Sequence, residues 1–197
     1  MRLATCFIVV LLTALAVACA SSPAPRYFRL TAAAGPASGA DAGTGARAVI
    51  VGPFQLAEYL DRPQIVTRDG ENGVIVADFE RWAEPLDANF QSVVTANVAR
   101  LLGSDRVLEY PAQTILKPER RVTGRISRLD VDTQGRAVLE VQWGVLDASG
   151  TAAGPGGQPG RRSRYEVRAE GESDTARVAA MNATVTAFSA DVAAALR

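Results

Sequence analysis

The chain opens with a segment that we do not expect to belong to the folded protein. Arg2 is followed by an uncharged apolar run of 16 residues, from Leu3 to Ala18. A positive start, an apolar run and an exit of small residues are together typical of a secretory signal peptide. The run is shorter than the roughly 20 residues that span a bilayer comfortably, which disfavours a permanent transmembrane helix. We therefore expect residues 1–18 to be removed on export.

The end of this run indicates a lipid anchor on the mature chain. The segment Leu15–Cys19 resembles the bacterial lipobox, in which small residues precede an obligatory cysteine. The resemblance implies cleavage between Ala18 and Cys19 and acylation of Cys19, which becomes the first mature residue. Ala16 stands where leucine is usual, and an ordinary cleavage after an A-x-A site is the alternative. Residues 20–25, rich in Ala, Ser and Pro, are typical of a lipoprotein tether.

The residue after this cysteine bears on the destination of the protein. In lipoproteins of Gram-negative bacteria, Asp at this position usually marks retention at the inner membrane, and this chain has Ala20. By this resemblance we expect a lipoprotein of the outer membrane that faces the periplasm. Several acyl chains on Cys19 give stable anchoring, whereas a single chain is marginal.

The composition removes much of the common enzymatic chemistry. The chain has no His and only two Cys, of which Cys6 lies in the discarded peptide and Cys19 carries the anchor. This excludes a His-based triad, ordinary zinc sites and a cysteine nucleophile in the mature protein. The 21 basic and 21 acidic residues balance, which argues against a nucleic-acid partner. We expect no enzymatic activity, no metal and no cofactor.

The mature chain divides into a tether and one domain. Arg26–Leu30 is a short β-prone stretch, and Thr31–Ala46 contains no apolar residue larger than Ala. Such a stretch cannot bury enough surface to order itself, so we expect a flexible tether over 19–46. The folded domain is then expected over 47–197, long enough to build its own core.

The domain shows two helical stripes and about six strand patterns. Apolar residues recur at three- and four-residue steps over Leu86–Leu102, which ends before Gly103, and over Asp174–Leu196, where Asp174 is the expected N-cap. Strand patterns cover 48–51, 64–68, 74–79, 121–131, 138–146 and 162–169. These elements predict a single α+β domain with a mostly antiparallel sheet and the two helices packed on one face.

Candidates for catalysis are weak. The glycine-rich stretch 154–160 lacks the Lys, and the place between strand and helix, that a phosphate loop needs. The acid pairs Asp78/Glu80 and Asp130/Asp132 stand at strand spacing, and we interpret them as solvated strand edges.

Two segments concentrate aromatic, Arg and Pro residues, as binding surfaces do. They are Tyr59–Arg68 and Arg81–Leu86. Trp82 has two interpretations of equal weight: it belongs to a binding surface, or it closes the end of the core beneath the first helix.

These segments carry a specific family resemblance. The chain resembles the PqiC/YmbA-type lipoproteins, the ABC-type transport auxiliary lipoprotein component family. The features that agree, in order, are Cys19 with Ser21–Ser22, Arg26–Leu30, Val51–Pro53, Tyr59–Arg68, and Trp82–Leu86 leading into Asn97–Gly103. The glycine-rich loop after Asp147 and the Ala-rich last helix fit the family loosely.

The resemblance implies a transport role without catalysis. Family members accompany inner-membrane ABC transporters whose periplasmic subunits carry mammalian-cell-entry (MCE) domains, and these systems are thought to move lipids between the two membranes. It implies an MCE-domain partner, and it leaves open whether the chain forms a homo-oligomer. The motif residues that we expect to bind the partner are Tyr59, Arg62, Pro63, Gln64, Trp82, Glu84, Pro85 and Leu86. The alternative is a periplasmic protein that carries an apolar ligand inside its own domain.

Overall fold

The computed structural model describes residues 23–35, 48–112, 117–153 and 160–197. The predicted signal peptide 1–18, the lipidation site Cys19 and the cleavage position Ala18 lie outside the described residues. So do residues 36–47, which hold most of the predicted linker, and residues 154–159 of the glycine-rich stretch.

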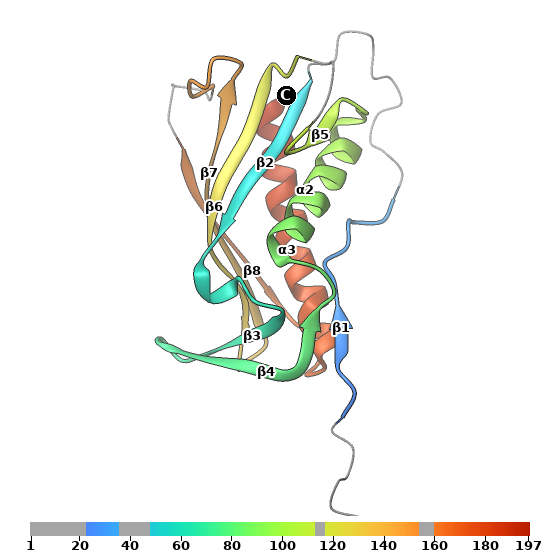
Figure 1. Ribbon diagram of the computed structural model, residues 1–197, viewed down its shortest axis with the longest axis vertical. Coiled ribbons are helices and arrows are strands. Elements are labelled where there is room, and N and C mark those ends of the chain that lie inside the picture. The colour runs from blue at the N-terminus through green and yellow to red at the C-terminus, as the bar shows by residue number, and fades with distance from the viewer. Residues whose placement is uncertain (1–22, 36–47, 113–116, 154–159) are drawn as a thin grey trace, which may run out of the picture.

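The described residues form one mixed sheet with two α-helices (Figure 1). The strands are β1 (Arg26–Phe28), β2 (Val49–Leu56), β3 (Gln64–Asp69), β4 (Gly73–Trp82), β5 (Val107–Glu109), β6 (Arg120–Asp132), β7 (Arg136–Asp147) and β8 (Arg161–Arg168). The helices are α2 (Leu86–Leu102) and α3 (Asp174–Leu196), with a 3₁₀ turn η1 (Glu58–Leu60). The predicted single-domain α+β fold is confirmed.

The long strand β6 organises the sheet. It pairs antiparallel with β7 along almost its whole length, and β7 pairs antiparallel with β8. On its other edge β6 pairs parallel with two strands in succession, β2 and then β3, with η1 between them. The hairpin of β3 and β4 is antiparallel, as the sequence predicts. Parallel pairs also join β2 to β5 and β1 to β4, so the sheet mixes both directions more than the sequence indicates.

Both helices cover the same face of the sheet through the predicted stripes (Figure 1). Helix α2 begins and ends at the predicted residues, and Gly103 closes it in the left-handed conformation with φ of 61°. Helix α3 also has the predicted bounds, but the N-cap is Ser173, whose side chain accepts a hydrogen bond from the Ala176 N–H at 3.2 Å. Asp174 is instead the first helical residue.

Aromatic side chains fill the space between the helices and the sheet. Phe188 of α3 lies at the centre, with its ring 5.8 Å from those of Phe54 and Phe90 and 5.4 Å from that of Trp143. Phe54 and Phe90 also meet edge to face at 5.3 Å. Aromatic pairs of this geometry add to the stabilisation from apolar burial. The aromatic contacts join β2, β7, α2 and α3 into one core.

Helix α3 is long and apolar enough to cross a membrane, and half of its most apolar window is buried inside the domain. Its buried residues include Met181, Val185, Phe188 and Val192, which face the sheet and α2. We interpret it as a core helix of the folded domain.

Candidate partner-binding loops and the anchor segment

Four of the eight predicted motif residues are exposed and lie in two adjoining loops. Arg62 and Pro63 follow η1, whereas Glu84 and Pro85 connect β4 to α2. The loops are joined through the backbone, since the Trp82 N–H donates to the Pro63 carbonyl at 2.7 Å. We call Arg62, Pro63, Glu84 and Pro85 the loop patch. Exposed residues held by rigid neighbouring strands are available to a partner without prior rearrangement.

Trp82 and Leu86 are not part of this exposed surface. Their exposed fractions are 5% and 4%, and both belong to the core cluster. Trp82 ends β4 and Leu86 begins α2. Of the two interpretations of Trp82, the structure therefore supports the one in which it closes the end of the core. Gln64 is half-buried in β3, opposite Arg81 of β4.

Tyr59 belongs to a buried ionic network around Asp130. Its hydroxyl donates to Asp130 Oδ2 at 2.9 Å, Arg68 Nε donates to the same oxygen at 3.3 Å, and Arg128 Nε donates to Oδ1 at 2.8 Å. Burial, together with the Asp130 carboxylate, raises the pKa of Tyr59 to about 12. Both oxygens of Asp130 are thus satisfied by charged or polar donors, as a buried charge requires.

The interpretation of Asp130 and Asp132 as solvated strand edges is wrong. Asp130 has no exposed surface and Asp132 is also buried. Asp132 accepts from the Arg136 backbone N–H and from Arg136 Nε, each at 2.8 Å. Burial acts to raise the pKa of Asp132, but these hydrogen bonds outweigh it and hold the pKa below its usual value. Both aspartates therefore stabilise the end of β6.

Residues 26–33, which the predicted tether over 19–46 includes, are folded onto the domain. Strand β1 pairs with the end of β4, Phe28 opposite Trp82, and Leu30 has no exposed surface. The Leu30 N–H donates to Asn89 Oδ1 at 2.6 Å, and Asn89 Nδ2 donates to the Leu30 carbonyl at 3.2 Å. The sequence marks Arg26–Leu30 as β-prone, but the partners that order this segment lie far along the chain.

Two further asparagines hold the same segment, which we call the anchor segment (Arg26–Ala33). Asn97 Oδ1 accepts from the Ala33 N–H at 2.8 Å, and Asn182 Oδ1 of α3 accepts from the Thr31 N–H at 3.0 Å. No pattern in the sequence assigns this role to Asn89, Asn97 or Asn182. Asn is a poor helix former, so an Asn beside an apolar stripe inside a helix is the signal that points to such a contact.

Ion pairs at the surface join the anchor segment to its surroundings. Arg26 Nη2 lies 2.9 Å from Asp174 Oδ2, and Arg29 Nε lies 3.9 Å from Glu84 Oε1. The second pair connects the anchor segment to the loop patch. Exposed pairs of this kind contribute little stability and mainly orient the side chains.

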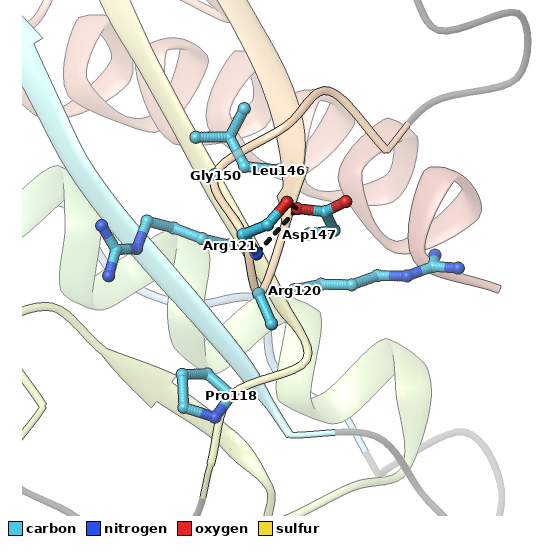
Figure 2. Close-up of a pocket in the computed structure, with 8 residues that line it drawn as sticks. Pro118, Arg120, Arg121, Leu146, Asp147 and Gly150 are labelled. Carbon is cyan, nitrogen blue, oxygen red and sulfur yellow. Dashed lines mark hydrogen bonds between the residues drawn. The ribbon is translucent and has the colours of Figure 1, made fainter.

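The cavities along the described residues are shallow grooves that do not gather catalytic groups. Figure 2 shows one of 250 Å³ near the end of β7, where Arg120 and Arg121 extend in opposite directions. Arg120 donates to the carbonyls of Ala195 and Leu196 at the end of α3, and Arg121 lies over the Tyr110 ring. Within the described ranges, no cluster of three or more His, Cys, Asp or Glu side chains has the geometry to hold a metal.

A family comparison agrees with this architecture. The model of the ABC-type transport auxiliary lipoprotein component family matches residues 28–193. The chain belongs to this family. The match starts within the anchor segment, before the predicted start of the domain at residue 47. It extends through most of α3, and so includes the loop after Asp147 and the last helix, whose sequences fit the family loosely.

Solved structures show the same fold. A crystal structure of an uncharacterized protein has a TM-score of 0.69 at 17% identity, covering 87% of this chain and 98% of that chain. Protein XCC0632 from Xanthomonas campestris has a TM-score of 0.62 at 14% identity, covering 85% of this chain and 92% of that chain. No curated protein matches the sequence significantly. Membership makes this protein a bacterial lipoprotein, anchored to a membrane, of a family that serves ABC-type transporters.

Proposed function

We propose that the protein is an outer-membrane lipoprotein, facing the periplasm, that acts as auxiliary component of an MCE/ABC-type lipid transport system and so supports membrane integrity. In this role it catalyses no reaction itself. The observation that carries the proposal is the family match over residues 28–193, which covers both the domain and its anchor segment. Ala20 after the lipidation site Cys19 favours the outer membrane as the destination.

The anchor segment supports a docking role close to the membrane. Seven positions separate Cys19 from Arg26, where β1 begins. A fully extended chain of that length reaches about 25 Å, at roughly 3.3–3.6 Å per residue. The domain is therefore held near the bilayer that takes the acyl chains, and an MCE-domain partner has to reach across the periplasm to meet it.

The loop patch is the surface that we assign to the partner. Arg62 and Glu84 carry opposite charges, and Pro63 and Pro85 limit the backbone freedom that binding would otherwise remove. The two loops are fixed by the Trp82–Pro63 hydrogen bond and by burial of Trp82 and Leu86 beneath them. The buried motif residues thus act by holding the exposed ones in place.

The core argues against the alternative of a carrier that holds an apolar ligand inside the domain. Such a ligand would occupy the space between the helices and the sheet, and the rings of Phe54, Phe90, Phe188 and Trp143 are already in contact there. Pockets for small ligands generally enclose about 300–1,000 Å³. A groove of 470 Å³ between β8 and the start of α3 falls within this range. It is open at the surface, however, and the charged Arg168 and Glu170 line it beside small alanines, so it does not enclose an apolar ligand.

Crosslinking in intact membranes followed by recovery of the lipoprotein tests the proposal. We expect an MCE-domain subunit among the crosslinked proteins, and we expect deletion of the gene to make cells permeable to detergents. The double variant Arg62→Glu/Glu84→Arg should abolish the crosslink. Asp105→Arg, a charge reversal in the exposed turn between α2 and β5, should keep it. An intact permeability barrier together with no recovered transporter subunit would contradict the proposal.

A further inference from the structure

The β3–β4 hairpin exposes apolar side chains that the domain does not cover. The exposed fractions of Val74, Ile75 and Val76 are 43%, 50% and 36%. Ahead of Glu80, the described part of β4 pairs only with β3, and β3 pairs on its other side with β6. This half of the hairpin is therefore a ribbon at the edge of the sheet, with β4 outermost. Three consecutive β-branched apolar residues on such an edge are a liability unless something covers them.

Both faces of the ribbon are apolar. Side chains alternate along a strand, so Val74 and Val76 lie on one face and Ile75 on the other. The Ile75 face borders an open groove of 210 Å³, whose apolar lining includes Val178 and Met181 of α3. A strand that only covers a core needs a single apolar face. The ribbon therefore presents apolar groups in more directions than packing within the domain requires.

The hairpin lies at the end of the molecule from which the N-terminal chain leaves the domain (Figure 1). Strand β1 runs parallel to β4 with Arg26 opposite Glu80, so the residues before Arg26 leave toward the end where β4 begins. Tyr27, with an exposed fraction of 64%, adds a further apolar ring to this region. Tyr is favoured at membrane interfaces because its ring is apolar and its hydroxyl is polar.

We propose that the β3–β4 hairpin, through Val74, Ile75 and Val76, rests in the interface of the bilayer that holds the Cys19 acyl chains. This inference rests on the anchoring in the proposed function, because the seven positions between Cys19 and Arg26 keep this end within about 25 Å of the membrane. The lipid surface is thus the nearest large apolar phase that can cover the ribbon.

The charges of the turn set the orientation of the hairpin. Asp69, the last residue of β3, and Glu71 in the turn are both exposed. Insertion tip first would place these carboxylates in hydrocarbon, which is costly. The hairpin therefore lies with the free edge of β4 along the surface and the turn at the level of the headgroups, so that apolar side chains from both faces of β4 reach the interface.

A fluorescent label at a single position tests this contact on the lipidated mature protein in phosphatidylethanolamine/phosphatidylglycerol vesicles. Because Cys19 is acylated and Cys6 is removed, one introduced cysteine can be labelled with the environment-sensitive dye NBD. We expect the label at Ile75→Cys to shift to shorter emission wavelength on vesicles and to be quenched by doxyl-labelled lipids. The control Ala148→Cys is exposed in the loop after β7, at the opposite end of the molecule, and should show neither change.

The outcomes separate this inference from the proposed function. Two results on the vesicle-bound protein would overturn the inference. The label at position 75 could stay in water. Alternatively, it could be shielded without being quenched by doxyl lipids, which would indicate that another protein chain covers the hairpin. Failure of the acylated protein to bind vesicles at all would instead contradict the anchor on which the proposed function depends. Adding Val74→Ser and Val76→Ser to the labelled protein should reduce the quenching at least twofold while the circular dichroism spectrum stays unchanged.

Discussion

The side-chain amide of Asn89 forms two hydrogen bonds with the backbone of Leu30, one at 2.6 Å to its N–H and one at 3.2 Å to its carbonyl. Both residues are buried, and they lie 59 positions apart in the sequence. The amide side chain thus replaces a neighbouring strand for one residue of the anchor segment. Helix α2 and the chain that leads to the lipid anchor are joined at this point.

Asn89→Ala should loosen the anchor segment. The substitution leaves the Leu30 N–H and carbonyl buried without partners, which costs about 1–3 kcal/mol per group. We expect a lower melting temperature and faster hydrogen exchange over residues 28–33, with little change at β6 and β7. Asn72→Ala, in the exposed turn between β3 and β4, is the matched control and should leave both quantities unchanged. Equal exchange rates in wild type and Asn89→Ala would contradict the role of this contact.

Asp130→Asn should be among the most destabilising single substitutions in the domain. It leaves Arg68 and Arg128 without their buried countercharge, and breaking a buried pair from one side costs about 3–5 kcal/mol. The free energy of unfolding in urea measures the loss. Glu140→Gln removes an exposed partner of Arg164, and it should cost about 1 kcal/mol or less. Similar losses for the two variants would mean that the Asp130 network contributes no more than a surface pair.

The stability of the domain should fall between pH 10 and pH 12 because of Tyr59. Its pKa is raised from 10.0 to about 12 in the folded state. The unfolded chain therefore loses this proton first as the pH rises, so the contribution is complete below pH 10 and disappears as the pH passes through the folded pKa. Tyr59→Phe should flatten this decline, although Tyr165, whose pKa is also raised by burial and by Asp191, keeps part of it.

Absorbance at 295 nm gives an independent check on this titration. Native protein should show about two tyrosinates fewer near pH 11 than the same protein in denaturant, because Tyr59 and Tyr165 both stay protonated in the fold. The native titration curve of Tyr59→Phe should lack the component near pH 12. A native curve in which every tyrosine ionises at its ordinary pKa would refute the buried network around Asp130.

Gly52→Ala should destabilise the domain more than an alanine at another glycine with positive φ. Gly52 has φ of 107°, and a Cβ there would lie 1.9 Å from Gln91 Oε1. Gly70 has φ of 62° with open space around it, so Gly70→Ala reports the backbone strain alone, about 1–2 kcal/mol. We expect Gly52→Ala to lose more than that in urea unfolding. The difference should shrink when Gln91→Ala is added, because the obstructing side chain is then absent.

Local patterns predicted the helices well, since each is held by its own apolar stripe. The bounds of α2 and α3 follow from residue spacing, Pro85 and Gly103. The three-residue strand β5 escaped prediction, as it carries too few residues for a pattern and exists through pairing with β2. Strand β1 lies in a stretch that is β-prone in the sequence, but its pairing with the distant β4 could not be predicted. Strands of this kind are specified by tertiary contacts, which periodicity does not report.

The candidate site, too, could be predicted only in part from the sequence. The two motif segments adjoin in the fold, but residue type alone did not separate the exposed Arg62 and Glu84 from the buried Trp82 and Leu86. The burial of Asp130 depends on Arg68, from a strand 62 positions earlier. A carboxylate at strand spacing looks solvated until its distant cationic partners are known.

The parallel pairing of β1 with β4 determines how the domain responds to mechanical load. A force applied through the chain before Arg26 runs along the axis of β1. Its hydrogen bonds to β4 are then loaded together in shear instead of being opened one after another. The side chains of Asn89, Asn97 and Asn182 bind the backbone of the residues that follow β1. These hydrogen bonds resist any force that the β1–β4 pairing does not. A pull on this end of the chain therefore meets several hydrogen bonds at once, so the domain resists unravelling from its N-terminal strand.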